Sequence, residues 1–568
     1  MLLIADFTIA GFTHFLNAGE PPCLQASAAP FDQVVPVLVD STAACWKSRP
    51  ELALVWTRPQ GAIKSFAPLL DHEQVALEEL LAEVDGFAEC LRQAAKRVSA
   101  LFVPTWTLPS YDRGLGVLNF RPPAGPAYCL MRMNARLAEA VAADSTIHVL
   151  DAGRWVAQAG PAASSPKLWH LGKIAFGPEV FRHAAADVKA AVRALRGQAR
   201  KLVVLDLDDT LWGGIVGDVG WQNLNLGGHN PIGESFSAFQ RALKRLCNRG
   251  IVLAVVSKNT EAIALEAIER HPEMALRLRD FAGWRINWTD KVRNIIDLTA
   301  ELKLGLESVV FIDDNPAEQA RVRDALPQVL VPEWPADKLL YEQALAELTC
   351  FDTFSLTEED HARTRMYVSE RERKVARESV QSLETYLASL GLTVTVERLG
   401  PSSVARAAQL LNKTNQLNLT TRRMTEARYL QYARSEGQEV FVFRVADRFD
   451  DYGLTGIATL SVNGAEGDLS DFLLSCRVMG RGVEQTMLHV IAEHARSLGL
   501  ARLVATYIPT ERNAPCKQFF DEQSGFAPSE DGIRYVWELR GPYPLPEHVG
   551  LQYSADAQAG AHRPPVLS

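Results

Sequence analysis

The sequence predicts a multidomain α/β protein whose central part is a doubly wound parallel sheet. Short apolar runs recur along the chain and alternate with stretches that have the periodicity of amphipathic helices. In the middle of the chain, three such runs lead directly into acidic or hydroxyl side chains. Strands of a parallel sheet end in this way where the sheet presents a ligand site at its carboxyl edge. The length of 568 residues allows about three or four domains.

Composition and charge exclude several classes of protein. With 47% hydrophobic and 22% charged residues, the chain is neither mainly disordered nor fibrous. With a net charge of −9, the chain lacks the excess of basic residues that binding to nucleic-acid phosphates requires. No apolar run approaches the roughly 18–20 residues of a membrane helix, and the start has no basic region before Asp6. The 8 cysteines form no CxxC pair, as is typical of a reducing compartment. We expect a cytoplasmic protein without nucleic-acid or membrane partners.

Residues 1–195 form the first predicted domain. Apolar runs such as 2–7 and 34–39 alternate with helical stretches at Gln74–Ser99 and Ala127–Ala143. This alternation indicates an α/β domain.

Residues 196–350 form the second predicted domain and give the clearest fold signal. Strands are expected at 202–205, 251–257 and 308–314, and amphipathic helices near 233–249, 260–271 and 290–304. Short apolar strands joined by helices predict a parallel sheet.

A charged helical connector is expected over 351–379, followed by a third domain over 380–540. The third domain has predicted strands at 393–397, 440–447, 455–462, 469–475 and 501–508, and helices near 402–412, 424–435, 483–498 and 513–523. Residues 541–568 are rich in Pro, Gly and small side chains with little to bury, so we expect a disordered tail.

Chemically reactive side chains stand at the ends of the strands of the second domain. An Asp-x-Asp-x-Thr motif ends the first strand, a serine ends the next, a lysine begins a helix, and an acidic pair ends a later strand. The residues are Asp206, Asp208, Thr210, Ser257, Lys291, Asp313 and Asp314. A lone acidic pair at a strand end is usually a loop cap, whereas the full ordered set indicates a catalytic site.

These residue types suit phosphoryl transfer. A carboxylate can attack phosphorus only if the negative charge of the phosphate is offset, and Mg²⁺ held by carboxylate oxygens does this. A second acid two residues further on can protonate the leaving oxygen and later activate water. A hydroxyl and a lysine stabilise the charge that develops on the phosphoryl oxygens.

The set resembles the motifs of the haloacid dehalogenase (HAD) superfamily. The resemblance implies that Asp206 is the nucleophile and Asp208 the acid/base. It implies phosphate binding by Thr210, Ser257 and Lys291, and Mg²⁺ binding by Asp206, the backbone of Asp208, and Asp313, with Asp314 as the alternative ligand. Only about fifty residues separate Asp208 from Ser257, so a small flap over the site is expected in place of a large cap domain.

Longer blocks resemble a narrower family, the FkbH-like proteins of the HAD-IIIC group. The blocks are residues 205–220, 271–291, 410–423 and 472–484. The resemblance implies an enzyme of polyketide-type pathways that takes a three-carbon unit from 1,3-bisphosphoglycerate. It delivers the glyceryl group as a thioester to the phosphopantetheine arm of an acyl carrier protein.

The third domain carries an Arg-x-x-Gly-x-Gly turn between a predicted strand and a helix. Its residues Arg477, Gly480 and Gly482 are expected to bind pantetheine, because glycines at such a turn free backbone N–H groups to meet a pyrophosphate at a helix N-terminus. Together with residues 513–526, the turn resembles the GNAT acyltransferases, which bind the pantetheine arm of coenzyme A. Phe520 stands where many GNAT enzymes have a tyrosine acid, so acetyl transfer to an amine is not expected.

Cys476 lies between this predicted strand and the turn. Backbone N–H groups and Arg477 would lower the pKa of its thiol and stabilise an acyl oxyanion, so Cys476 is the candidate for a covalent acyl-enzyme. The alternative is a buried structural cysteine. Cys516 and Cys247 are weaker candidates.

The remaining features leave alternatives open. The polar run 412–423 either lines the acyl or pantetheine path, binds a substrate phosphate, or is a surface loop. The first domain resembles SGNH hydrolases but lacks their residues: Ala5–Thr8 replaces the nucleophile motif, and His170 is isolated. We therefore expect an SGNH-like scaffold, a HAD-like domain and a GNAT-like α+β domain.

Three functions are compatible with these features. The leading hypothesis is a bifunctional enzyme that removes phosphate and loads a carrier protein. The others are a plain metal-dependent phosphatase of a small metabolite and a non-enzymatic carrier-protein or scaffold module. Thr210, Ser257 and Lys291 argue against the last, because Mg²⁺ binding alone does not require them.

Overall fold

The computed structural model describes residues 1–19, 22–354, 358–378, 382–414, 416–424, 426–435, 437–475, 477–510 and 513–554. The chain divides into two compact units, one formed by Met1–Leu278 with Trp284–His361 and the other by Arg279–Gly283 with Ala362–Ser568. Two parallel sheets occupy the first part of the chain, and a mostly antiparallel sheet follows. This arrangement confirms the predicted multidomain α/β class, while the predicted boundaries of individual domains stay predictions.

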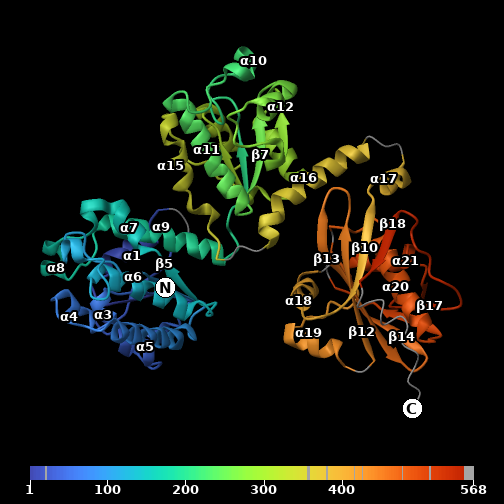
Figure 1. The fold of residues 1–568 in the computed structure, drawn as a ribbon, viewed down its shortest axis with the longest axis horizontal. Helices are drawn as coiled ribbons and strands as arrows, with labels where there is room; N and C mark the ends of the chain where they lie inside the picture. Colours follow the sequence, from blue (N-terminus) through green and yellow to red (C-terminus); the bar gives the residue numbers. More distant parts are fainter. Residues whose placement is uncertain are drawn as a thin grey trace. The chain divides into compact units, whose positions relative to one another are not determined.

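The N-terminal sheet is parallel and has the strand order β2-β1-β3-β4-β5. Its strands are β1 (Leu2–Ala5), β2 (Ser27–Ala28), β3 (Leu52–Trp56), β4 (Ala100–Pro104) and β5 (Ile147–Leu150). Alternate residues of β1 and β3 enter two different buried clusters, so both faces of the sheet are covered. Figure 1 shows helices on both sides of this sheet, with α5 on one and α7 and α9 on the other.

Nine α-helices accompany this sheet in the described residues. They are α1 (Ala10–Asn17), α2 (Val34–Val39), α3 (Pro59–Ala62), α4 (Phe66–Leu70), α5 (Leu77–Ala95), α6 (Pro126–Val141), α7 (Ala152–Ala159), α8 (Pro166–Gly172) and α9 (Pro178–Leu195). The helical predictions for 74–99 and 127–143 correspond to α5 and α6.

The apolar run 34–39, grouped with the predicted strands, forms helix α2 instead. Val34, Val37 and Leu38 are buried, whereas Val35 and Val39 are 42% and 47% exposed. This burial follows a helical spacing and not the alternation of a strand. A short apolar run does not distinguish the two structures by itself.

The second sheet has the order β8-β7-β6-β9, with β6 parallel to both β7 and β9. Its strands are β6 (Leu202–Leu205), β7 (Val252–Ser257), β8 (Phe281–Ile286) and β9 (Val309–Ile312). Its helices are α10 (Val216–Val219), α11 (Pro231–Asn248), α12 (Glu261–Arg270), α13 (Lys291–Glu301), α14 (Pro316–Ala325) and α15 (Tyr341–Ala346). Strand β8 was not predicted: it is an edge strand, and Gly283 and Arg285 interrupt its apolar pattern.

The third sheet is antiparallel except for two parallel pairs, β14 with β15 and β10 with β18. Its strands are β10 (Leu392–Arg398), β11 (Leu417–Asn418), β12 (Gln438–Ala446), β13 (Asp451–Asn463), β14 (Glu466–Leu474), β15 (Arg502–Thr506), β16 (Ala527–Pro528), β17 (Arg534–Glu538) and β18 (Val549–Tyr553). The predicted strands of the third domain all match members of this sheet.

Helices cover both faces of the third sheet. They are α18 (Val404–Lys413), α19 (Glu426–Ala433), α20 (Val483–Ser497) and α21 (Ala514–Glu522), and α16 (Glu358–Glu378) and α17 (Leu383–Ser389) precede the sheet in the chain. Apolar residues of α18 and α19 lie in one buried cluster, and those of α20 and α21 in another. The charged helix predicted for the connector corresponds to α16.

The prediction of a disordered tail from residue 541 is wrong for residues 541–554. Strand β18 pairs in parallel with β10, and Tyr543 is only 3% exposed. The hydroxyl of Tyr543 donates to the carbonyl oxygen of Ser524 at 2.8 Å. Residues 555–568 lie outside the described part of the chain.

No helix in the described ranges has the length and apolar character needed to cross a membrane.

We predict that removing residues 541–554 destabilises the third sheet. The truncation deletes β18 and the buried side chain of Tyr543, and loss of one large buried side chain costs about 3 kcal/mol or more. A chain that ends at Arg540 should melt about 6–12 °C below one that ends at Ser554, as measured by circular dichroism. Equal melting temperatures would contradict this packing role.

Candidate active site

The carboxyl ends of three neighbouring strands bring the predicted residues of the second sheet together. Asp206 follows the last residue of β6, Ser257 is the last residue of β7, and Asp313 follows the last residue of β9. Because β7 and β9 both pair in parallel with β6, these three ends lie at one edge of the sheet. The sequence prediction placed them at this edge.

Lys291 reaches the same edge from the N-terminus of helix α13. The side chain of Asp290 caps this helix by accepting a hydrogen bond from the Val292 amide at 2.7 Å. The Nζ atom of Lys291 lies 3.0 Å from Oδ2 of Asp206 and 2.5 Å from Oδ2 of Asp313. All three side chains are buried, with exposures of 4%, 11% and 0%.

The electrostatics of this triad follow from its burial. Desolvation raises the pKa of Asp313 to about 6, and the like charge of Asp206 acts in the same direction. Desolvation alone would lower the pKa of Lys291, but the two carboxylates raise it above its usual value. The ammonium therefore stays charged and holds the two acids in place.

Asp206, Asp313 and Asp314 together can hold a divalent cation. Each offers a carboxylate oxygen, and these atoms lie within 4.8 Å of one another. Oδ1 of Asp206 is buried and has no hydrogen-bond partner in the described part of the chain. An unpaired buried carboxylate oxygen among further oxygen donors fits a hard cation such as Mg²⁺. Both Asp313 and Asp314 are within reach as ligands.

Asp208 is held by three N–H donors. Its Oδ1 accepts from Nε1 of Trp212 at 2.8 Å and from the Val216 amide at 3.1 Å, and its Oδ2 accepts from Nδ2 of Asn259 at 2.8 Å. Burial raises the pKa of Asp208 above its usual value. Trp212 and Val216 belong to the short segment 211–221, which contains α10 and corresponds to the predicted flap.

Thr210 and Lys338 surround Asp314. The amide of Asp314 donates to Oγ1 of Thr210 at 3.2 Å, and that hydroxyl lies 3.4 Å from Oδ1 of Asp314. Nζ of Lys338 lies 3.3 Å from Oδ2 of Asp314 and donates to the carbonyl oxygen of Asp209 at 2.7 Å. Thr210 and Ser257 are both almost fully buried.

Sequence reasoning assigned no role to Trp212, Asn259 or Lys338. Asn259 stands two residues after Ser257, so its proximity to a strand end was the available signal. Trp212 belongs to the flap segment but has no distinguishing motif. Lys338 lies 24 residues beyond Asp314 in the chain, and no periodicity or motif points to it.

The predicted acyl-transfer residues are placed only in part. Cys476 lies outside the described residues. Gly480 and Gly482 have φ angles of 74° and 86°, which glycine adopts without strain. The amide of Gly480 donates to Oε1 of Glu484 at 2.7 Å. The weaker candidates Cys247 and Cys516 are buried, and desolvation raises the pKa of Cys516 to about 12.

The polar run 412–423 contributes two residues to the third sheet and begins at the end of α18. Leu417 and Asn418 make up β11, which pairs with β14, and both residues are buried. Nδ2 of Asn412 donates to the carbonyl oxygen of Met424 at 2.7 Å, which closes the run into a loop. A plain surface loop therefore does not describe residues 417–418.

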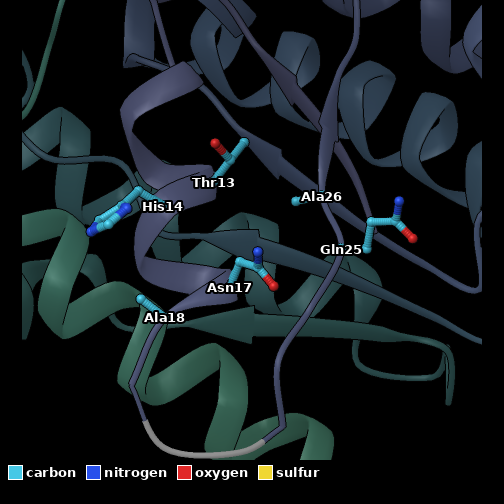
Figure 2. A pocket seen from close by; sticks show the side chains of 6 residues that line it. All are labelled: Thr13, His14, Asn17, Ala18, Gln25 and Ala26. Atoms are coloured by element: carbon cyan, nitrogen blue, oxygen red, sulfur yellow. The ribbon is translucent and has the colours of Figure 1, made fainter.

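A cavity of about 520 Å³ lies beside the N-terminal sheet. Figure 2 shows that helix α1 lines one wall and the segment before β2 the other. Its lining residues are Thr13, His14, Asn17, Ala18, Gln25 and Ala26. None of the predicted catalytic or binding residues lies here.

Comparison with known proteins gives one informative similarity. No protein-family model matches the chain, and no curated protein matches it. The N-terminal part of the protein BF1531 from Bacteroides fragilis is 27% identical, with a TM-score of 0.57. The match covers 62% of this chain and 94% of that one. That solved structure contains a phosphatase domain in complex with Mg.

Two acetyltransferases match a shorter part of the chain. The ribosomal-protein-S18-alanine N-acetyltransferase from Escherichia coli is 14% identical, covering 26% of this chain and 94% of its own, with a TM-score of 0.20. A GNAT-family acetyltransferase from Desulfovibrio desulfuricans is 16% identical, covering 26% and 99%, with a TM-score of 0.21. TM-scores of 0.20 and 0.21 do not establish a shared fold.

Replacing Lys291 by Met is predicted to destabilise the protein, because Asp206 and Asp313 lose their shared counter-charge. Breaking a buried ion pair on one side costs about 3–5 kcal/mol, measured by urea unfolding without divalent cations. Lys258→Met is the matched control, since Lys258 pairs with Glu318 at 2.6 Å but its side chain is 39% exposed. An exposed pair contributes about 1 kcal/mol or less. Equal losses in the two variants would contradict the structural role of the triad.

Proposed function

We propose that this protein is a Mg²⁺-dependent HAD-type phosphatase and glyceryl transferase that acts in the cytoplasm on 1,3-bisphosphoglycerate. The observation that carries the phosphatase half is the buried triad of Asp206, Lys291 and Asp313 at the carboxyl edge of a parallel sheet. The similarity to a phosphatase domain crystallised with Mg supports this half. The transferase half rests on the FkbH-like sequence blocks.

In the proposed phosphatase step, the carboxylate of Asp206 attacks the phosphorus of the phosphate ester. One carboxylate oxygen of Asp206 acts as the nucleophile and the other is available to Mg²⁺, while Lys291 lies 3.0 Å from Oδ2. Asp208 protonates the leaving oxygen and then takes a proton from the water that hydrolyses the aspartyl phosphate. Asn259 and Trp212 orient Asp208 for this exchange.

The remaining residues of the edge bind the phosphoryl group. Thr210 and Ser257 offer hydroxyls, and the ammonium of Lys291 offsets the negative charge that develops in the transition state. Mg²⁺ would be held by Asp206, the backbone of Asp208, and Asp313 or Asp314, and would supply further charge neutralisation.

In the proposed transfer step, the thiolate of Cys476 attacks the C1 carbonyl carbon of the acyl phosphate. The bond from C1 to the phosphate oxygen breaks, inorganic phosphate leaves, and a thioester forms. No ATP is needed because an acyl phosphate is already activated. The thiol of a carrier protein's phosphopantetheine arm, reaching the turn at Arg477, Gly480 and Gly482, then attacks the thioester and releases Cys476. The order of this step and of C3 dephosphorylation stays open.

The alternative is a stand-alone Mg²⁺-dependent phosphatase of a small phosphorylated metabolite. The short flap 211–221 favours neither function, because an uncapped site admits both small and bulky substrates.

Asp206→Asn is expected to lower Mg²⁺-dependent phosphate release by more than about 10³-fold, because the amide cannot act as the nucleophile. A phosphate-release assay with and without a chelator measures this effect. Asp218→Asn, an exposed substitution in α10 of the flap, is the control and should retain activity. Full activity of Asp206→Asn would refute the assignment of the nucleophile.

Incubation with 1,3-bisphosphoglycerate and Mg²⁺ is expected to add one glyceryl or phosphoglyceryl group to the chain, detected by intact mass. Cys476→Ala should abolish the adduct and leave C3 phosphate release intact, because the phosphatase residues are unchanged. Cys516→Ala should retain the adduct, since this thiol is fully buried. No adduct on the unsubstituted protein, with phosphate still released, would favour the stand-alone phosphatase.

A further inference from the structure

The turn before helix α20 has the form of an anion site. Gly480 and Gly482 both have positive φ angles, and Gly482 is the N-cap of this 15-residue helix. Backbone N–H groups and the helix dipole at such a terminus attract phosphate. The sequence predicted that a pyrophosphate meets these amides, but side chains of the protein itself occupy the turn.

The side chain of Glu484 already accepts the hydrogen bond that the Gly480 amide could donate to a phosphate. Its Oε1 accepts the Gly480 amide at 2.7 Å, and the residue is only 4% exposed. In either protonation state of Glu484, an oxygen of this side chain fills the place that a phosphate oxygen would take. As a carboxylate it also repels an approaching phosphate.

The segment after β17 covers Gly482. A Cβ atom built on Gly482 would lie 2.9 Å from Nε2 of His548 and 3.3 Å from Cβ of Pro546. Nε2 of His548 lies 2.9 Å from the carbonyl oxygen of Arg481 and donates to it. Buried Tyr543 fixes one end of this segment and strand β18 fixes the other. His548 and Pro546 therefore cover Gly482 as a stable part of the fold.

The guanidinium of Arg481 is likewise committed within the protein. It lies 3.4 Å from the carboxylate of Asp447, whose side chain is buried, and 3.6 Å from the exposed carboxylate of Glu370. It also donates to the hydroxyl of Tyr452. Arg373 pairs with the same two carboxylates, so Arg481 shares them, and its guanidinium is already held by contacts within the protein.

We propose that the turn excludes the diphosphate of free coenzyme A, and that Glu484 and His548 are the residues that determine this specificity. A diphosphate bound at the turn would lose hydrogen bonds to water without gaining one from the Gly480 amide. A buried charge without hydrogen-bond partners is costly in free energy. A carrier-bound phosphopantetheine arm has a single phosphodiester with one negative charge and needs fewer donors. The preference for the carrier-bound thiol rests on the proposed function, whereas the exclusion of coenzyme A does not.

Isothermal titration calorimetry of the full chain with coenzyme A tests the exclusion directly. The unsubstituted protein should bind coenzyme A with a Kd above about 1 mM. Glu484→Ala and His548→Ala each remove one obstacle, and we expect at least about a tenfold tighter Kd in one of them or in the double variant. Glu484→Gln keeps a side-chain oxygen at the Gly480 amide and removes only the charge, so it should bind coenzyme A less tightly than Glu484→Ala. If Glu484→Ala fails to fold, His548→Ala carries the test.

Glu493→Ala is the matched control, because Glu493 lies on the same helix but pairs with Arg496 at the surface. It should leave coenzyme A binding unchanged. Coenzyme A binding to the unsubstituted protein with a Kd below about 100 μM would overturn the proposal. Continued exclusion in the double variant would overturn the roles of Glu484 and His548.

A second measurement separates this proposal from the proposed function. The acylated protein is offered a phosphopantetheinylated carrier protein or an equal concentration of coenzyme A as acceptor, and thioester products are weighed. Acylation of the carrier alone supports both proposals, and acylation of coenzyme A overturns the exclusion. Failure to acylate either acceptor, together with no binding of coenzyme A by calorimetry, counts against the transferase function and leaves the exclusion standing.

Discussion

The buried ammonium of Lys291 between Asp206 and Asp313 is the interaction on which the phosphoryl site depends. The two buried carboxylates at this edge of the sheet repel each other. The free-energy cost of their desolvation is offset by the nearby positive charge of Lys291. The triad joins the residues directly after β6 and β9 to the first residue of α13, so it fixes the relative positions of three elements. The same charge is then available to an incoming phosphoryl group.

The flap 211–221 contacts this edge of the sheet through Asp208. Trp212 and Val216 donate to one oxygen of Asp208, and Asn259 donates to the other. Because both oxygens have N–H partners, the orientation of the acid is tied to the position of the flap and of the loop after β7. The short flap thus helps to place the side chain of Asp208.

Periodicity predicted α5, α6 and the central strands of the second and third sheets, and several of its failures have local causes. The continuous apolar run 34–39 is compatible with a strand or a helix. Only the burial of Val34, Val37 and Leu38 distinguishes the two structures. Strand β8 contains a glycine and an arginine, so it lacks the apolar run of a central strand. Residues 541–554 have few apolar side chains, but Tyr543 packs in the core of the third domain and β18 pairs with β10.

The sequence by itself determined which residues stand at the carboxyl ends of the central strands, and therefore which groups meet at the edge. This follows because parallel strands end at a common edge whatever the details of packing. Only the tertiary structure decided that Asn259 holds Asp208, that Glu484 takes the Gly480 amide and that His548 covers Gly482. Most of these contacts join residues distant in the chain, and all depend on side-chain direction, which neither a motif nor a periodicity encodes.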